Sequence, residues 1–144
     1  MRFAVDRLDH LVITCRDVET SAGWYQRVLG MEREEFGTSQ RRTALKFGGQ
    51  KINLRPASAT QDAWFSGTAA APGTQDLCFI VTVPPEEVVR HLEAIGVAVE
   101  LGPVAKDGAL GPIRSVYCRD PDGNLIEIAG YGEAFGTPPD PAGA

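Results

Sequence analysis

The sequence predicts an α+β protein built from two copies of one module, each ordered as a strand, a helix and three strands. The segment LDHLVIT resembles QDLCFIV, and aligning His10 with Asp76 gives an offset of 66 residues. The same offset carries Gly30, at the end of WYQRVLG, onto Gly96, at the end of RHLEAIG. Shared spacing between matching segments indicates an internal repeat.

The closing strands of the two copies support the same repeat. QKINLRP resembles GNLIEIA, and this match pairs Asn53 with Glu127 at an offset of 74 residues. The eight additional residues fit a longer loop, KDGALGP, in the second copy. Because the order of the elements agrees as well, we interpret the chain as a duplication.

In the first copy, alternation of apolar and polar residues predicts a strand over 8–14. Asp17 is suited to cap a helix that Gly30 would end. Three further strands are expected over 31–37, 41–47 and 50–55, the last two joined by Gly48–Gly49.

In the second copy, the same reasoning predicts a strand over 75–82 and a helix opened by Pro84–Pro85. Gly96 would end this helix. Strands are expected over 97–102, 113–119 and 124–130, and the run Asp120–Gly123 would join the last two.

The domain organisation follows from this repeat. We expect a single domain over 1–144, with module one over about 5–56 and module two over about 74–131. Residues 57–73, rich in Ala, Gly, Ser, Thr and Pro, would link the modules, and a loosely ordered tail would cover 132–144.

Composition excludes several classes of protein. A net charge of −5 without a Lys/Arg cluster argues against nucleic acid or anionic membranes as partners. No apolar run approaches the roughly 18 residues of a membrane-spanning helix, and Asp6 and Asp9 argue against a secretory signal. The three cysteines form no CxxC pair, which favours reduced thiols in a cytoplasmic protein. A small molecule is the expected partner.

Strand alternation places one polar residue of each key strand opposite aliphatic neighbours. His10 opposes Leu11 in this way, and Asp76, Asn53 and Glu127 do so in their own strands. Taken singly, each has a plainer explanation as a surface or hydrogen-bonding residue. Their equivalent positions favour a shared cleft, provided that the two sheets curl toward each other and the register is correct.

Four stretches carry a resemblance to a known family over about residues 5–131: LDHLVITCRDVETSAGWYQRVLGME, ALKFGGQKINL, PGTQDLCFIV and SVYCRDPDGNLIEIAGY. They resemble the vicinal-oxygen-chelate superfamily of glyoxalases, bleomycin resistance proteins and extradiol dioxygenases. The similarity is closest to glyoxalase-domain-containing-5-like proteins. The resemblance implies two βαβββ modules forming a half-open mixed-sheet barrel around a metal, usually in a homodimer.

Carried over by position, the resemblance implies a divalent-metal site of His10, Asp76 and Glu127. The ion would be Mn, Fe, Ni, Zn or Mg, since an oxygen-rich ligand set suits all of them. Asp76 replaces a histidine common in the family, and Asn53 replaces the fourth ligand of glyoxalase I. These two departures argue against strict glyoxalase I activity.

The function expected from such a site is that of a glyoxalase-like lyase or isomerase acting on a small substrate with adjacent oxygens. Glu127 would move the proton, and Tyr117, Arg119 and Asn53 would contact the substrate, with ordinary packing as the alternative for Tyr117.

Two alternatives remain open. An extradiol dioxygenase normally needs a second histidine, and His91 lies in the middle of a predicted helix. A metal-free drug-binding resistance protein would leave the carboxylates to repel one another. The segment Lys106–Pro112 is either a plain connector or a cover for the cleft.

Overall fold

The computed structural model describes residues 2–132, so the expected tail lies outside the described residues from position 133 onward. The chain divides into two compact units, unit 1 (Met1–Thr74) and unit 2 (Gln75–Ala144), and each is described by itself. Among the described residues, neither helix has the length and apolar character that crossing a membrane requires.

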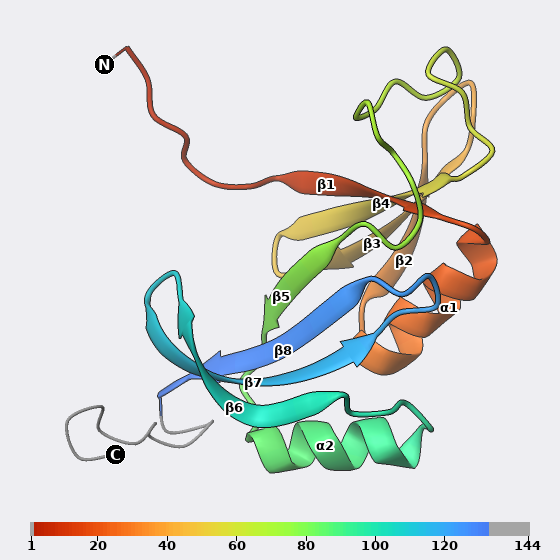
Figure 1. Ribbon diagram of the computed structural model, residues 1–144. Helices are drawn as coiled ribbons and strands as arrows, with labels where there is room; N and C mark the ends of the chain where they lie inside the picture. The colour runs from red at the N-terminus through yellow and green to blue at the C-terminus, as the bar shows by residue number, and fades with distance from the viewer. Residues whose placement is uncertain (1, 133–144) are drawn as a thin grey trace. The chain divides into compact units, whose positions relative to one another are not determined.

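Unit 1 is a four-stranded mixed sheet with one helix on one face (Figure 1). The strand order is β1-β4-β3-β2, in which β1 pairs with β4 in parallel and the other pairs are antiparallel. The helix contacts the two central strands. The elements are β1 (His10–Cys15), α1 (Val18–Leu29), β2 (Glu32–Phe36), β3 (Arg42–Phe47) and β4 (Gln50–Pro56).

The helix α1 begins and ends where the sequence predicts. The Asp17 carboxylate accepts hydrogen bonds from the amides of Glu19 and Thr20 at 3.0 and 3.3 Å. Gly30 ends the helix in the left-handed conformation, with φ of 65°. The buried stripe of the helix includes Tyr25, which is fully buried as expected for a core aromatic residue.

Unit 2 repeats this topology with the strand order β5-β8-β7-β6. Its helix contacts β7 and β8, the counterparts of the strands that α1 contacts. The predicted α+β class with two βαβββ modules is therefore confirmed. The elements are β5 (Asp76–Ile80), α2 (Pro85–Ala94), β6 (Leu101–Gly108), β7 (Gly111–Arg119) and β8 (Leu125–Tyr131).

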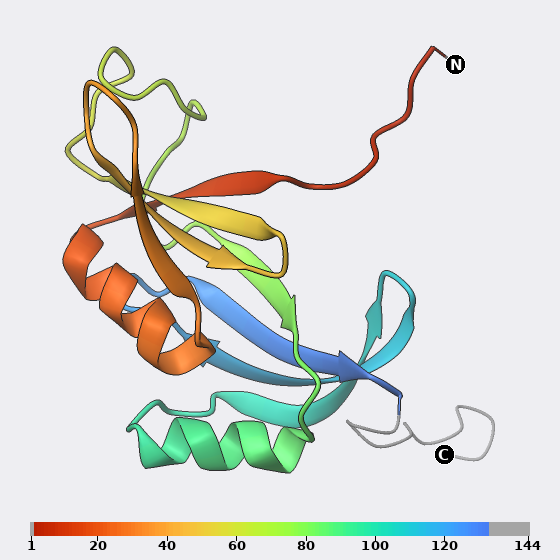
Figure 2. The same cartoon turned by 180° about the vertical axis from the view of Figure 1, so that it is seen from behind.

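The strand β6 differs from its prediction. A strand was expected over 97–102, followed by a loop, but β6 covers Leu101–Gly108 and forms a hairpin with β7 (Figure 2). Pairing with β7 outweighs the local glycine and proline signals, and a bulge between Leu101 and Val104 accommodates Pro103, which has no amide proton to donate. Lys106 therefore belongs to a strand rather than to a connecting loop.

Strand register confirms the internal alignment residue by residue. Asn53 pairs with Val12 on β1 and with Ala44 on β3. Glu127 pairs with Cys78 on β5 and with Tyr117 on β7. The offsets of 66 and 74 residues read from the sequence carry the first set onto the second at β1 and β4. Asn53 and Glu127 thus occupy the same position in the two sheets.

Candidate functional site

The richest group of polar side chains in unit 2 lies on the sheet face opposite α2. A pocket of about 330 Å³ opens on this face. Four residues that the sequence singles out line it together, namely Asp76, Tyr117, Arg119 and Glu127. Glu100, Leu101, Lys106 and Leu125 complete the lining. A concave site with several convergent ionisable groups is the default place for ligand binding.

Glu127 is held by a buried hydroxyl group. The Oγ of Ser115 donates a hydrogen bond to Oε2 of Glu127 at 2.5 Å, and Ser115 is fully buried on the neighbouring strand. A charge-assisted hydrogen bond of this length fixes the orientation of a carboxylate. Glu127 therefore presents its Oε1 atom in a defined direction.

Two weakly acidic groups beside Glu127 keep their protons. Burial, followed by the charge of Glu127, raises the pKa of the Tyr117 phenol to about 12. The same two causes, in the same order, raise the pKa of the Cys78 thiol to about 11. The charge of Asp76 contributes to both shifts. At neutral pH, Tyr117 is thus a hydrogen-bond donor beside a carboxylate.

The pocket also contains two cationic side chains. The Arg119 guanidinium forms a two-point interaction with Glu100, from Nε to Oε2 at 2.8 Å and from Nη2 to Oε1 at 3.1 Å. The Nζ atom of Lys106 lies 5.9 Å from the centre of the Tyr117 ring, and no ion pair to Lys106 is present among residues 2–132. Lys106 is therefore the cation that remains available to a ligand.

A hydrogen-bond network at the turn before β8 positions this face. Oδ1 of Asp120 accepts from the amides of Asp122 and Asn124 at 2.9 and 3.0 Å, and its Oδ2 accepts from Nδ2 of Asn124 at 2.7 Å. Oδ1 of Asn124 in turn accepts from the amide of Gln75 at 2.9 Å, directly before β5. The DPDGN segment thereby fixes β8 next to β5, and so places Glu127 beside Cys78.

The matching face of unit 1 carries His10 and Asn53. The Nδ1–H group of His10 donates to Oδ2 of Asp9 at 2.8 Å, and this hydrogen bond is the main cause that lowers the pKa of Asp9. The bond leaves Nε2 of His10 as the nitrogen that is able to bind a metal. Asn53 is only 5% exposed, and its Oδ1 has no hydrogen-bond partner among the described residues. A buried amide oxygen of this kind calls for a donor or a cation.

The predicted metal ligands are divided between the two units. Asp76 and Glu127 share the pocket of unit 2, whereas His10 belongs to unit 1. Within either unit, the described residues bring together no group of three or more His, Cys, Asp or Glu side chains that could hold a metal. The donor types suit a divalent ion, but the three-ligand site remains a prediction.

Sequence reasoning missed the role of two pocket residues. Ser115 was placed on the face of Tyr117, but its bond to Glu127 depends on the pairing of β7 with β8. Lys106 was assigned to a loop. Continuing the alternation of β6 past Asp107 and Gly108 would have placed Lys106 on the same face as Ser115 and Tyr117.

Comparison with known proteins agrees with this geometry. Residues 7–128 match the model of the Glyoxalase/Bleomycin resistance protein/Dioxygenase superfamily. The chain is 44% identical over 133 residues to virulence protein STM3117 of Salmonella typhimurium, covering 91% of this chain and 88% of the relative. It is also 44% identical to the glyoxalase domain-containing protein RDO1 of Mycosarcoma maydis, covering 92% and 73%.

A solved structure shows the same fold at similar identity. The integron cassette protein VCH_CASS1, from the mobile metagenome of V. cholerae, is 41% identical with a TM-score of 0.85, covering 92% of this chain and 100% of that one. The repeated module, the family match and these relatives lead to one conclusion. The chain belongs to the Glyoxalase/Bleomycin resistance protein/Dioxygenase superfamily.

Proposed function

We propose that the protein is a glyoxalase-like, metal-dependent lyase or isomerase acting on a small substrate with adjacent oxygens. One observation carries the proposal. The carboxylates of Asp76 and Glu127 line the same pocket, and neither forms an ion pair within residues 2–132. Two like charges in one pocket repel each other unless a cation or a proton neutralises them.

A divalent ion fits the donors that this chain offers. Asp76 and Glu127 would hold it with carboxylate oxygens, and His10, oriented by Asp9, is the predicted third ligand. The unpartnered amide oxygen of Asn53 is a further oxygen donor, to the ion or to the substrate. When bound, the ion would act as a Lewis acid toward the adjacent oxygens of the substrate.

The proton transfer is assigned to Glu127. Its carboxylate would take a proton from the carbon next to the substrate carbonyl and return it to the neighbouring carbon. The hydrogen bond from Ser115 to Oε2 leaves Oε1 for this task. Tyr117, which keeps its proton because its pKa is raised to about 12, would donate a hydrogen bond to a substrate oxygen.

Positive charge in the pocket favours a substrate with an anionic group. Lys106 is available for such a group, while Arg119 is held by Glu100 at the same pocket. A carboxylate on the substrate would pair with the ammonium group of Lys106.

The dioxygenase alternative is weaker on structural grounds. It needs a second histidine, and the only one besides His10 is His91. His91 lies on α2, which packs on the sheet face opposite Asp76 and Glu127.

Metal analysis tests the proposal directly. Protein purified without added metal or chelator is expected to contain one divalent ion per chain. The variants Asp76→Asn, Glu127→Gln and His10→Ala should lose most of it, whereas the control Glu93→Gln, on the exposed face of α2, should keep it. Unchanged metal content in His10→Ala and Glu127→Gln would refute the ligand assignment.

Activity assays separate the reaction classes. Consumption of the hemithioacetal formed from methylglyoxal and a thiol would support a lyase. Iron-dependent oxygen uptake with catechols would instead identify a dioxygenase.

The assembly and location of the protein are part of the same proposal. We expect a cytoplasmic homodimer, as the family resemblance implies. Light scattering coupled to size-exclusion chromatography measures the mass directly, and a monomer at micromolar concentration would contradict this expectation.

A further inference from the structure

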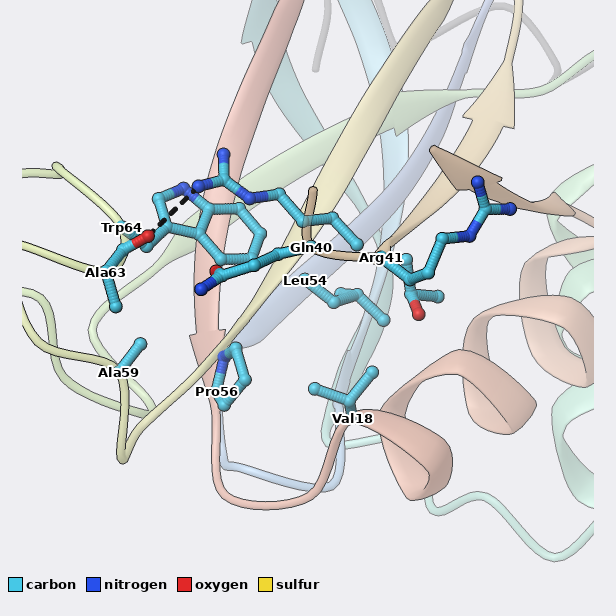
Figure 3. A pocket seen from close by; sticks show the side chains of 10 residues that line it. Val18, Gln40, Arg41, Leu54, Pro56, Ala59, Ala63 and Trp64 are labelled. Carbon is cyan, nitrogen blue, oxygen red and sulfur yellow. Dashed lines mark hydrogen bonds between the residues drawn. The ribbon is translucent and has the colours of Figure 1, made fainter. Parts of the chain in front are cut away.

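Unit 1 contains a second pocket that the proposed reaction does not use (Figure 3). It has a volume of about 150 Å³ and lies where the start of α1, the start of β3 and the end of β4 meet residues 59–64. Val18, Leu54 and Pro56 give it an apolar floor, and Trp64 forms one wall. Although residues 57–73 were expected to be a linker, Trp64 is buried against the sheet.

Two arginines hold this wall in place. Arg55 donates from Nε and Nη2 to the carbonyl of Trp64 at 3.2 and 3.1 Å, and from Nη2 to the carbonyl of Ala59 at 3.0 Å. The guanidinium of Arg42 lies 4.0 Å from the centre of the Trp64 ring and donates to the carbonyl of Ala63 at 3.3 Å (Figure 3). The pocket is therefore preorganised rather than formed by a loose loop.

The positive charge around this pocket is not neutralised by the chain. Arg55 is only 3% exposed, and its hydrogen bonds go to carbonyl groups. Within the described part of the chain, neither Arg42 nor Arg55 has a carboxylate at ion-pair distance. Arginine is seldom buried without an anionic partner. The missing negative charge is best supplied by a ligand.

The size and the lining of the pocket define the rest of that ligand. An apolar cavity of about 150 Å³ is large enough for one benzene ring. The indole of Trp64 offers an aromatic surface for such a ring, and Arg42, at the same wall, offers its charge. We propose that this pocket binds a one-ring aromatic carboxylate, with its ring over the apolar floor and its carboxylate paired with Arg42.

Benzoate is the probe that tests this site. Titration of the whole protein, followed by calorimetry and by tryptophan fluorescence, should show saturable binding of benzoate. Benzyl alcohol, which lacks the charge, and acetate, which lacks the ring, should each bind at least about tenfold more weakly, because a hydrogen bond to a charged group contributes a factor of this order. Trp64→Phe should abolish the fluorescence change, which would otherwise come from Trp24.

The chain offers a matched control for the charge. Arg42→Gln should weaken benzoate binding at least about tenfold. Arg41→Gln should leave it unchanged, since the Arg41 side chain points away from Trp64 and donates to the carbonyl of Gly37 at 3.2 Å (Figure 3). Absence of benzoate binding, equal binding of benzyl alcohol, or equal losses in the two arginine variants would overturn the proposal. If Arg42→Gln does not fold, the three probes on the unaltered protein still decide the question.

Discussion

The two units share one topology and one register, yet their equivalent faces carry different chemistry. At the position where unit 1 has Asn53 beside Ala44, unit 2 has Glu127 beside Tyr117. The amide of Asn53 is buried, whereas Glu127 lines an open pocket with a second carboxylate, Asp76. The comparison shows that the backbone pairing was kept after duplication while the side chains on the polar face diverged.

The opposite faces of the two sheets show no such divergence. Ile52 and Ile126 occupy equivalent positions, and both are fully buried against their helices. Packing against a helix tolerates only apolar side chains of suitable volume, so this face is under the same constraint in both units. The polar face is constrained by chemistry instead, and it is there that the two units differ.

The largest effect is expected when unit 2 is given the amide of unit 1. Glu127→Gln removes the proposed base, and the rate on the proposed substrate class should fall by about 10²- to 10⁴-fold. The measurement is the initial rate of hemithioacetal consumption at matched protein concentration. Glu93→Gln serves as the control and should retain full activity. Activity retained in Glu127→Gln would show that the polar face of unit 2 is not the reaction site.

Core substitutions should affect the two units alike. Ile52→Ala and Ile126→Ala each remove a fully buried side chain, so each should lower the free energy of unfolding by about 2–5 kcal/mol. Urea denaturation measures both. A loss below about 1 kcal/mol in one variant alone would show that the two helix-facing cores are not equivalent.

The turns before β4 and β8 should respond unequally. Asp120→Ala removes the acceptor of three hydrogen bonds and should cost about 1–3 kcal/mol. Gly49→Ala in unit 1 should cost about 1 kcal/mol, because Gly49 has a φ of 76° and no atom obstructs an added Cβ. Thermal unfolding monitored by circular dichroism compares them. A greater loss in Gly49→Ala would contradict the structural role of the Asp120 network.

The smallest effect concerns the helix starts. Asp17 caps α1 through its side chain, whereas Pro84 at the equivalent position of α2 makes no side-chain cap. Asp17→Ala should lower the free energy of unfolding by about 1 kcal/mol, and Pro84→Ala should change it by less than about 0.5 kcal/mol. Equal effects in urea denaturation would mean that the two helices begin in the same way.

Much of the fold was predictable because periodicity is a local property. Alternation placed Glu127 and Tyr117 on one face, and the capping residues Asp17 and Gly30 marked α1. The error at β6 has a physical cause. Gly102, Pro103 and Gly108 indicate a loop locally, but hydrogen bonding to β7 extends the strand through them.

The sequence by itself determined the duplicated module, the register of its strands and the polar face on which Asp76 and Glu127 lie, since side-chain alternation encodes all three. Only the tertiary structure decided which further residues join them. Lys106 reaches the pocket of unit 2 through a hairpin, and the second pocket exists because Arg42 and Arg55 hold Trp64 against the sheet of unit 1. Such contacts depend on long-range pairing and on the burial of charge, which no local pattern records.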